Sequence, residues 1–363
     1  MSIRTDILAA VRGHMPERVP WTVYSFELPR GEAERALRSQ GLGLVHPVPV
    51  LSAENFLHPN VEVAERTIID GGQTLRCLRY QTPVGELTEL RRTNYGAGIA
   101  GYLSDWRLEH MVKGPRDYEA LEFIVRDQVC KIDYGAIVQA QQEIGEDGVV
   151  IGRVGKVPFQ RLWTEYTGLE RLCLDLHDDR RLVEGVMQAM IEKDQELWRL
   201  MADSPAEMIQ CADSITANVV GPRLFDEYFL PYYQALGDVM RLAGKPILLH
   251  IDGQVHNLAS SINRLPEGFV VEAFTPPPTG DYSLADARAA WKDRVIWINF
   301  PSSVHSQPAE EIEAVALELL RQAAPGAGFL FGITENMPVD SWAKSLAAIG
   351  RVINQHGACP IRV

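Results

Sequence analysis

The chain has 363 residues, and its 35 basic and 48 acidic side chains give it a formal net charge of −13. This charge repels nucleic acids and anionic membrane surfaces, so we expect neither as a partner. The sequence has no apolar run near the roughly 20 residues of a membrane span, and the N-terminus lacks the pattern of a secretory signal. Five scattered cysteines with no CxxC pair favour a reducing compartment. We therefore expect a cytoplasmic protein.

In chain order, the first predicted elements are two strands and an insertion. VPWTVYSF at 19–26 and LGLVHPVPV at 42–50 are apolar, strand-like runs. From about residue 61 to 93, strand-like residues alternate around a GG turn and a TPVGE turn, which predicts an antiparallel β-hairpin insertion. Residues 94–147 contain NYGAGIAGYL and then DYEALEFIVRD, which predict a mobile loop followed by helices that lead back to the main fold.

Six further apolar runs follow residue 145, separated by helical patterns such as SLADARAAWKD: DGVVIGRVG, AEMIQCADSI, PILLHIDGQ, GFVVEAFTPPP, RVIWINFPSS and GFLFGITENMP. Strands that alternate with helices predict a parallel sheet, and their apolar composition predicts burial on both faces. With the two earlier strands there are eight, which predicts a single (β/α)8 TIM barrel domain over residues 1–363, with the insertion after its second strand. A doubly wound open sheet is the alternative, but no GxGxxG turn follows the first strand.

Polar side chains stand at the ends of six of these strands, where barrel enzymes gather their catalytic groups. In PILLHIDGQ, His250 and Asp252 are two residues apart and would leave the same face of a strand. We therefore predict a site built from the ends of different strands. Its candidate residues are Arg153, Lys156, Cys211, Asp213, His250, Asp252, Glu272, Asn299, Thr334 and Glu335.

Each candidate also has a purely structural interpretation. His250 alone would fit a core histidine bonded to backbone, but its pairing with Asp252 favours a site. Asp213 would equally bond the backbone of its own loop, and Glu272 would equally hold the adjacent TPPPTGD turn. For Asp213 and Glu272 the sequence leaves both interpretations open.

The residue types also fit a metal. Zinc binds imidazole nitrogen and carboxylate oxygen, and a catalytic zinc usually has three protein ligands and one open position. His250, Asp252 and Glu335 supply such a set. Asp252 would alternatively orient His250 without touching the metal. No GxSxG elbow points to serine catalysis.

Four further segments are distinctive: MPERVPW, CADSITANVVGPRLFDEYFLPYYQAL, HIDGQVHNL and EAFTPPPTGDYSLADAR. In the second of them, an acidic strand end is followed by GP and an F-x-E-Y-x-L-P-Y helix, which is an unusual order. Through these segments most of the chain, roughly residues 4–355, resembles the uroporphyrinogen decarboxylase superfamily. The resemblance implies a (β/α)8 barrel, as the strand pattern does.

The superfamily has two broad branches. True decarboxylases carry an arginine-rich motif of the type RQAGRYLPEY, whereas this chain has VYSFELPRGEAERAL, with Glu27 and only Arg30 close by. Corrinoid-dependent methyltransferases hold zinc with His-x-Cys and a distant Cys. His250 matches that histidine, Asp252 stands in place of the first cysteine, and Glu335 lies near the place of the second.

The resemblance therefore implies a zinc-dependent methyltransferase, with His250 and Glu335 as catalytic residues and Asp213, Glu272 and Asn299 shaping the substrate pocket. Nitrogen and oxygen ligands leave zinc a stronger Lewis acid toward oxygen than thiolates do. We thus expect O-demethylation of a methoxylated aromatic, with the methyl group passed to a corrinoid on a separate protein. A decarboxylase and a non-catalytic binding subunit are the alternatives.

Overall fold

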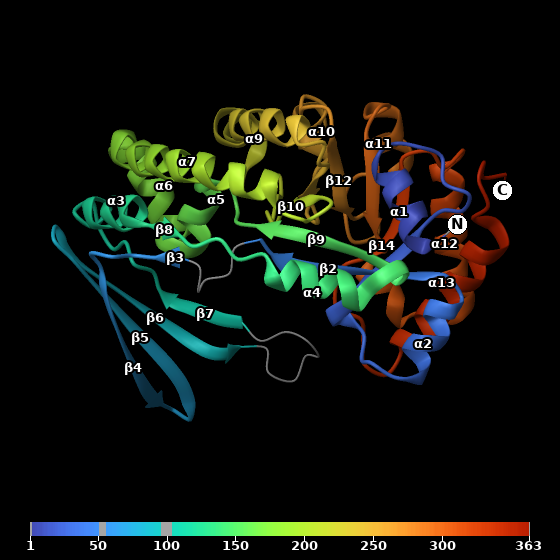
Figure 1. The fold of residues 1–363 in the computed structure, drawn as a ribbon, viewed down its shortest axis with the longest axis horizontal. Coiled ribbons are helices and arrows are strands. Elements are labelled where there is room, and N and C mark those ends of the chain that lie inside the picture. Colours follow the sequence, from blue (N-terminus) through green and yellow to red (C-terminus); the bar gives the residue numbers. More distant parts are fainter. Residues whose placement is uncertain (1, 51–55, 96–103, 363) are drawn as a thin grey trace. The chain divides into compact units, whose positions relative to one another are not determined.

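The computed structural model describes residues 2–50, 56–95 and 104–362. It contains a closed barrel of eight parallel strands in the order β1-β14-β13-β12-β11-β10-β9-β2 (Figure 1). This confirms the predicted (β/α)8 fold. The strands are β1 (Trp21–Tyr24), β2 (Leu42–Pro49), β9 (Gly148–Val154), β10 (Ile209–Cys211), β11 (Ile247–His250), β12 (Phe269–Phe274), β13 (Val295–Asn299) and β14 (Phe329–Ile333).

Helices connect the strands, and α10 to α13 pack side by side in chain order. Ser283 is the N-cap of α11, since its Oγ accepts a hydrogen bond from the backbone of Asp286 at 3.0 Å. The helices are α1 (Ile3–Val11), α2 (Glu32–Ser39), α3 (Asp117–Asp127), α4 (Gly135–Ile144), α5 (Pro158–Arg161), α6 (Leu169–Asp178), α7 (Arg180–Asp203), α8 (Gly221–Leu224), α9 (Leu230–Leu242), α10 (Ala259–Ile262), α11 (Leu284–Ala290), α12 (Ala309–Ala323) and α13 (Trp342–His356).

The chain divides into two compact units. The barrel unit comprises Met1–Val50, Tyr134–Val154 and Met201–Val363, and the second unit comprises Leu51–Asp133 and Gly155–Leu200. The description of the chain as one domain stays a prediction.

An antiparallel sheet in the second unit confirms the insertion after the second barrel strand. Its strands, in the order β4-β5-β6-β7, are β4 (Glu62–Asp70), β5 (Gln73–Thr82), β6 (Gly85–Tyr95) and β7 (Ser104–Glu109). β3 (Phe56–Leu57) and β8 (Val129–Cys130) form a separate pair. The sheet is larger than the predicted hairpin, because SDWRLE alternates polar and apolar residues and adds β7 within 94–147. Most of NYGAGIAGYL, residues 96–103, lies outside the described residues.

The interior of the barrel is apolar over most of its depth. Inward-facing residues from the strands join Ile7, Ala10 and Val11 of α1 in one buried cluster. Since α1 runs into β1, this packing closes the N-terminal end of the barrel and leaves the C-terminal ends of the strands for a site. The strand residues of the cluster are Tyr24, Val45, Val149, Ile151, Leu248, Val270, Val295, Trp297 and Leu330.

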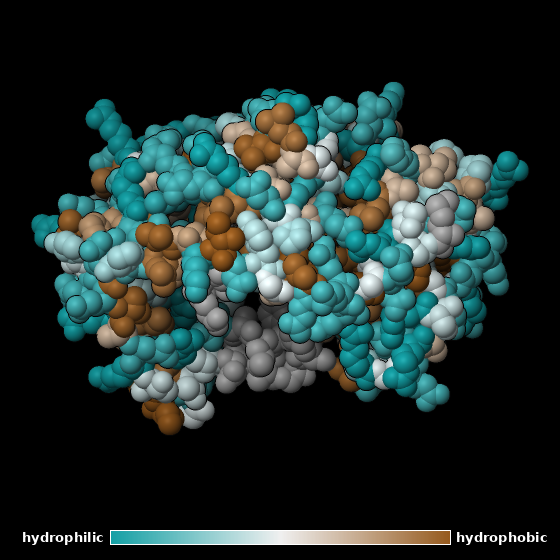
Figure 2. All heavy atoms as spheres, in the orientation of Figure 1, coloured by the Kyte–Doolittle hydropathy of each residue, from teal (hydrophilic) through white to brown (hydrophobic). Residues whose placement is uncertain are grey.

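The surface is mostly hydrophilic on the face drawn in Figure 2, with apolar residues scattered among charged ones. Of the helices that the structure describes, none has the length and apolar character to cross a membrane.

His305, in the turn after β13, is a buried histidine, and its burial can be tested through the pH dependence of unfolding. It is 1% exposed, and its Nδ1 lies 2.7 Å from Ser345 Oγ of α13. Burial lowers the pKa of His305 to about 4, whereas an unfolded histidine titrates near 6.5. As the pH falls from about 6.5 to 4, the unfolded chain therefore gains a proton that the folded protein does not take up.

We accordingly expect the wild type to lose about 3 kcal/mol more free energy of unfolding than His305→Gln over this pH interval. Urea unfolding at pH 7, 5.5 and 4 measures the difference. Above pH 7 the gap between the two proteins should be constant. Parallel pH profiles across the whole range would show that His305 is accessible to protons in the folded state.

Candidate functional site

A layer of polar side chains lies at the C-terminal end of the barrel interior. Each member stands two residues after an apolar residue of the buried cluster, and alternate residues of an extended chain share a face. The register also places neighbours level with one another, since Arg153 pairs with Gln210 and His250 pairs with Glu272. The layer consists of Arg153 on β9, Gln210 on β10, His250 on β11, Glu272 on β12 and Asn299 on β13.

Glu272 is the centre of this layer. Its side chain is 1% exposed, and Tyr24 Oη donates a hydrogen bond to its Oε1 at 2.7 Å. Gln210 Nε2 donates to Glu272 Oε2 at 3.0 Å and also to Tyr24 Oη at 2.6 Å. His250 Nδ1 lies 2.8 Å from Glu272 Oε2. One buried carboxylate thus joins β1, β10, β11 and β12.

The backbone of β12 is irregular directly after Glu272. Ala273 has φ 58°, and it is the one residue other than glycine with a positive φ among those that the structure describes. The pairing of β12 with β13 shifts between Glu272 and Phe274, as in a β-bulge. Bulges of this kind bend a strand and re-aim a side chain, and they are common beside active sites. Here the bulge sets the position of Glu272.

Glu272 and His250 shift each other's pKa. Burial disfavours the imidazolium, but Glu272 and Asp252 outweigh burial and raise the pKa of His250 to about 10. Burial likewise raises the pKa of Glu272, but His250, Tyr24 and Gln210 together bring it below its usual range. At neutral pH the metal-free site therefore holds an imidazolium beside a carboxylate.

The predicted partnership of His250 and Asp252 has a geometric basis. β11 ends at His250, and Asp252 Oδ2 lies 3.5 Å from His250 Nε2, on the opposite side of the ring from Glu272. The Asp252 side chain is 35% exposed. His250 is thus oriented from the buried side by Glu272 and faces Asp252 at the open side.

Glu335 lies in a different part of the barrel mouth. It follows β14, next to β1, and it interacts with Glu27 in the turn after β1. Burial and the nearby Glu335 raise the pKa of Glu27 to about 7. Among the described residues, no group of three or more His, Cys, Asp or Glu side chains is placed to hold a metal ion.

The two other predicted pocket residues make contacts within the protein. Asp213 is fully buried, and its Oδ2 accepts a hydrogen bond from Tyr233 of α9 at 2.7 Å. Asn299 Oδ1 accepts from the backbone of Thr334 at 2.9 Å, and its Nδ2 donates to Thr275 at 3.2 Å. Asn299 therefore holds the ends of β12, β13 and β14 together. Substrate binding by Asp213 and Asn299 stays a prediction.

Sequence reasoning missed Tyr24 and Gln210. Both have a signal in the sequence, since each stands at the end of a predicted strand, in VPWTVYSF and AEMIQCADSI. In the second strand we named Cys211, but Cys211 is next to Gln210 and faces the helices, where it interacts with Tyr233. A shift of one residue along a strand exchanges its two faces, and the sequence does not show which face is inside.

Among the buried polar atoms that have no hydrogen-bond partner in the part of the chain that the structure describes, three lie at the C-terminal ends of barrel strands. They are Arg153 Nε, Gln210 Oε1 and Thr334 Oγ1. Buried polar atoms are nearly always paired in proteins, so unpaired ones at the C-terminal strand ends are candidates for contact with a polar ligand.

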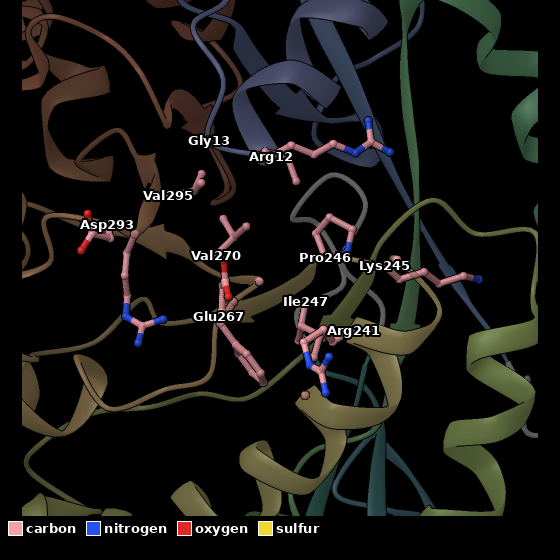
Figure 3. Close-up of a pocket in the computed structure, with 16 residues that line it drawn as sticks. Arg12, Gly13, Arg241, Lys245, Pro246, Ile247, Glu267, Val270, Asp293 and Val295 are labelled. Atoms are coloured by element: carbon pink, nitrogen blue, oxygen red, sulfur yellow. The ribbon is translucent and has the colours of Figure 1, made fainter.

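A cavity of about 450 Å³ lies at the other end of the barrel, where β11, β12 and β13 begin (Figure 3). Pro246, Ile247 and Val270 form part of its wall, and Figure 3 shows Arg12 and Lys245 extending away from them. Lys245 Nζ donates a hydrogen bond to the backbone oxygen of Met201 at 3.1 Å. Barrel enzymes carry their chemistry at the opposite end, so we do not place the site here.

Comparison with known proteins agrees with this architecture. The model of the uroporphyrinogen decarboxylase family (URO-D) matches residues 107–356, which is more than half of the chain. No curated protein matches the sequence. Among solved structures, a methyltransferase from Methanosarcina mazei has a TM-score of 0.60 at 12% identity, covering 98% of this chain and 99% of that one.

A glycoside hydrolase family 5 enzyme from Prevotella bryantii B14 has a TM-score of 0.45 at 11% identity, covering 97% of this chain and 99% of that one. The first likeness shows a shared fold, and the second is too weak to support an argument.

The coupling of His250 to Glu272 is testable by substitution. In metal-free protein, Glu272→Gln removes the adjacent negative charge, and we expect the pKa of His250 to fall by roughly 1 to 3 units. Titration of the imidazole by nuclear magnetic resonance measures this change. Glu267→Gln, an exposed residue just before β12, makes the same change in net charge and should leave the pKa of His250 unchanged. If the pKa of His250 is the same in the two variants, Glu272 does not influence the protonation of His250.

Proposed function

The chain belongs to the uroporphyrinogen decarboxylase family, and we propose that it is a methyltransferase that moves a methyl group from a methoxylated aromatic compound to a corrinoid on a separate protein. The observation that carries the proposal is the position of His250, held between Glu272 and Asp252 at the open end of the barrel. The methyltransferase activity of the protein from Methanosarcina mazei, which has the same fold, supports this branch.

The charges around the barrel mouth argue against a porphyrinogen with many carboxylates. Such a substrate needs several cationic side chains, as arginine and carboxylate bind in charge-assisted pairs. Here Glu27 and Glu335 stand together after β1 and β14. Arg30, the arginine near Glu27 in the sequence, is bound instead by Glu34 at 3.0 Å. We therefore favour methyl transfer over decarboxylation.

Transfer from a methyl ether breaks the bond between the methyl carbon and the oxygen. The oxygen keeps the electron pair, so negative charge develops there, and a fixed cationic group or hydrogen-bond donor stabilises that charge. His250 Nε2 faces Asp252, and the contact of His250 Nδ1 with Glu272 Oε2 fixes the orientation of the ring. Tyr24 and Gln210 in turn fix Glu272. These residues keep the site in place before the substrate enters.

Zinc is part of the proposal. His250 Nε2 and Asp252 Oδ2 fit it chemically, because they are nitrogen and oxygen donors side by side and the His250 ring is oriented through its other nitrogen, as in many zinc sites. Bound there, zinc would supply a Lewis acid for the ether oxygen. Glu335 is the proposed third ligand, although it interacts with Glu27 in this structure. Asp213, Glu272 and Asn299 would shape the substrate pocket.

Methyl transfer is tested with purified protein, cob(I)alamin and a panel of methoxyarenes. We expect formation of methylcobalamin with the wild type and a loss of at least ~100-fold in rate with His250→Ala, because that variant loses the residue that would hold the Lewis acid at the leaving oxygen. His256→Ala, an exposed histidine on the following turn, is the matched control and should retain activity. Carbon dioxide release from a porphyrinogen, without methyl transfer, would favour the decarboxylase.

Metal content tests the ligand set separately. After dialysis against limiting zinc, we expect near one zinc per chain in the wild type and none in His250→Ala. Glu272→Gln should weaken binding by roughly 10 to 100-fold, because Glu272 orients His250. Binding must also release a proton from His250, so zinc affinity should rise with pH. Full zinc content in Glu335→Gln would remove Glu335 from the ligand set, and full content in His250→Ala would refute the site.

A further inference from the structure

We propose that Arg153 binds a carboxylate group of the substrate, so that the methyl donor is an anionic methoxybenzoate and not a neutral methoxyarene. This inference rests on the proposed methyl transfer and specifies its substrate. It assigns to Arg153 a role in specificity at the same barrel mouth.

Arg153 lies in the wall of the polar layer. It stands two residues after the inward-facing Ile151 on β9 and is level with Gln210 on β10, which is bonded to Glu272. The positive charge of Arg153 also acts on Tyr24, which is hydrogen-bonded to Glu272. Burial and Glu272 raise the pKa of Tyr24 well above its usual range, and the positive charge of Arg153 opposes that rise.

Arg153 differs from other half-buried arginines of the barrel unit because it has no acceptor. Arg4 is paired with Glu207 at 2.6 Å, and Arg38 is paired with Glu34 at 2.7 Å. In the described parts of the chain, no hydrogen bond or ion pair engages the side chain of Arg153, and its Nε is buried without a partner. A desolvated guanidinium without an acceptor is costly. An anionic ligand would remove that cost.

The carboxylates nearest the polar layer are paired with His250. Glu272 lies 2.8 Å from one ring nitrogen and Asp252 lies 3.5 Å from the other, so neither carboxylate is paired with the guanidinium of Arg153. The planar fork of a guanidinium matches the two oxygens of a carboxylate. A carboxylate is therefore the ligand whose shape and charge fit Arg153.

The distance between Arg153 and His250 fits one aromatic ring. β10 separates β9 from β11 in the barrel, so their side chains stand two strand spacings apart, roughly 10 Å. A benzene ring with a carboxylate at one end and a methoxy group at the other spans this interval, with one hydrogen bond at each end. Carboxylate binding at Arg153 would thus place the ether oxygen near His250.

The experiment is isothermal titration calorimetry of 4-methoxybenzoate and of neutral methoxybenzene, on the wild type, Arg153→Gln and Arg153→Lys. We expect Arg153→Gln to bind 4-methoxybenzoate roughly 10 to 100-fold more weakly and methoxybenzene equally well. Arg153→Lys should be intermediate, since lysine keeps the charge but lacks the fork. Arg12→Gln, at the other end of the barrel, makes the same change in net charge and should bind both compounds as the wild type does.

Equal affinity of the wild type and Arg153→Gln for 4-methoxybenzoate would overturn the inference. Should Arg153→Gln fail to fold by circular dichroism, the comparison of Arg153→Lys with the wild type decides in the same way. Calorimetry measures ligand binding without corrinoid or methyl transfer. A failure of the inference about Arg153 can therefore be distinguished from a failure of the proposed function. Binding that depends on Arg153 without any methyl transfer would refute the proposed function alone. Methyl transfer from both compounds with equal kcat/KM in the wild type and Arg153→Gln would refute the role of Arg153 alone.

Discussion

The buried carboxylate of Glu272 is the constraint on which the barrel mouth depends. An ionised carboxylate in the interior is strongly unfavourable unless neighbouring groups compensate it. Tyr24, Gln210 and His250 supply that compensation from three other strands. Because each of these groups must reach the same two oxygen atoms, their strands are held in one relative position. The orientation of His250, and with it the proposed chemistry, follows from this requirement.

The apolar interior beneath this layer decides where the chemistry takes place. α1 packs Ile7 and Val11 against the inward-facing strand residues and closes the N-terminal end. The apolar interior strengthens the electrostatic interactions of the adjacent polar layer, since the local dielectric is low there. Polar atoms left without partners, on Arg153, Gln210 and Thr334, are found at the other end. The proposed substrate recognition and the orientation of His250 therefore take place at the same end of the barrel.

Much of the fold was readable from the sequence because burial on both faces produces apolar strands. His250, Glu272 and Asn299 were readable as well, since His250 and Asn299 end such strands and Glu272 lies two residues before the end of another. Tyr24 and Gln210 were not recognised, because which face of a short strand points inward depends on register. Glu335 was grouped with His250, although β14 and β11 are not neighbours in the barrel. Adjacency around a closed sheet is a property of the fold and not of the spacing along the chain.

Local periodicity is enough to predict the parallel barrel, the place of the insertion after the second strand and the strand ends that carry polar groups. The folded barrel was needed to show that Glu272 lies at the centre of the polar layer, that Glu335 interacts with Glu27, and that the side chain of Arg153 has no partner among the described residues. These features depend on contacts between strands far apart in the chain. Barrel closure creates such contacts, and no local pattern encodes them.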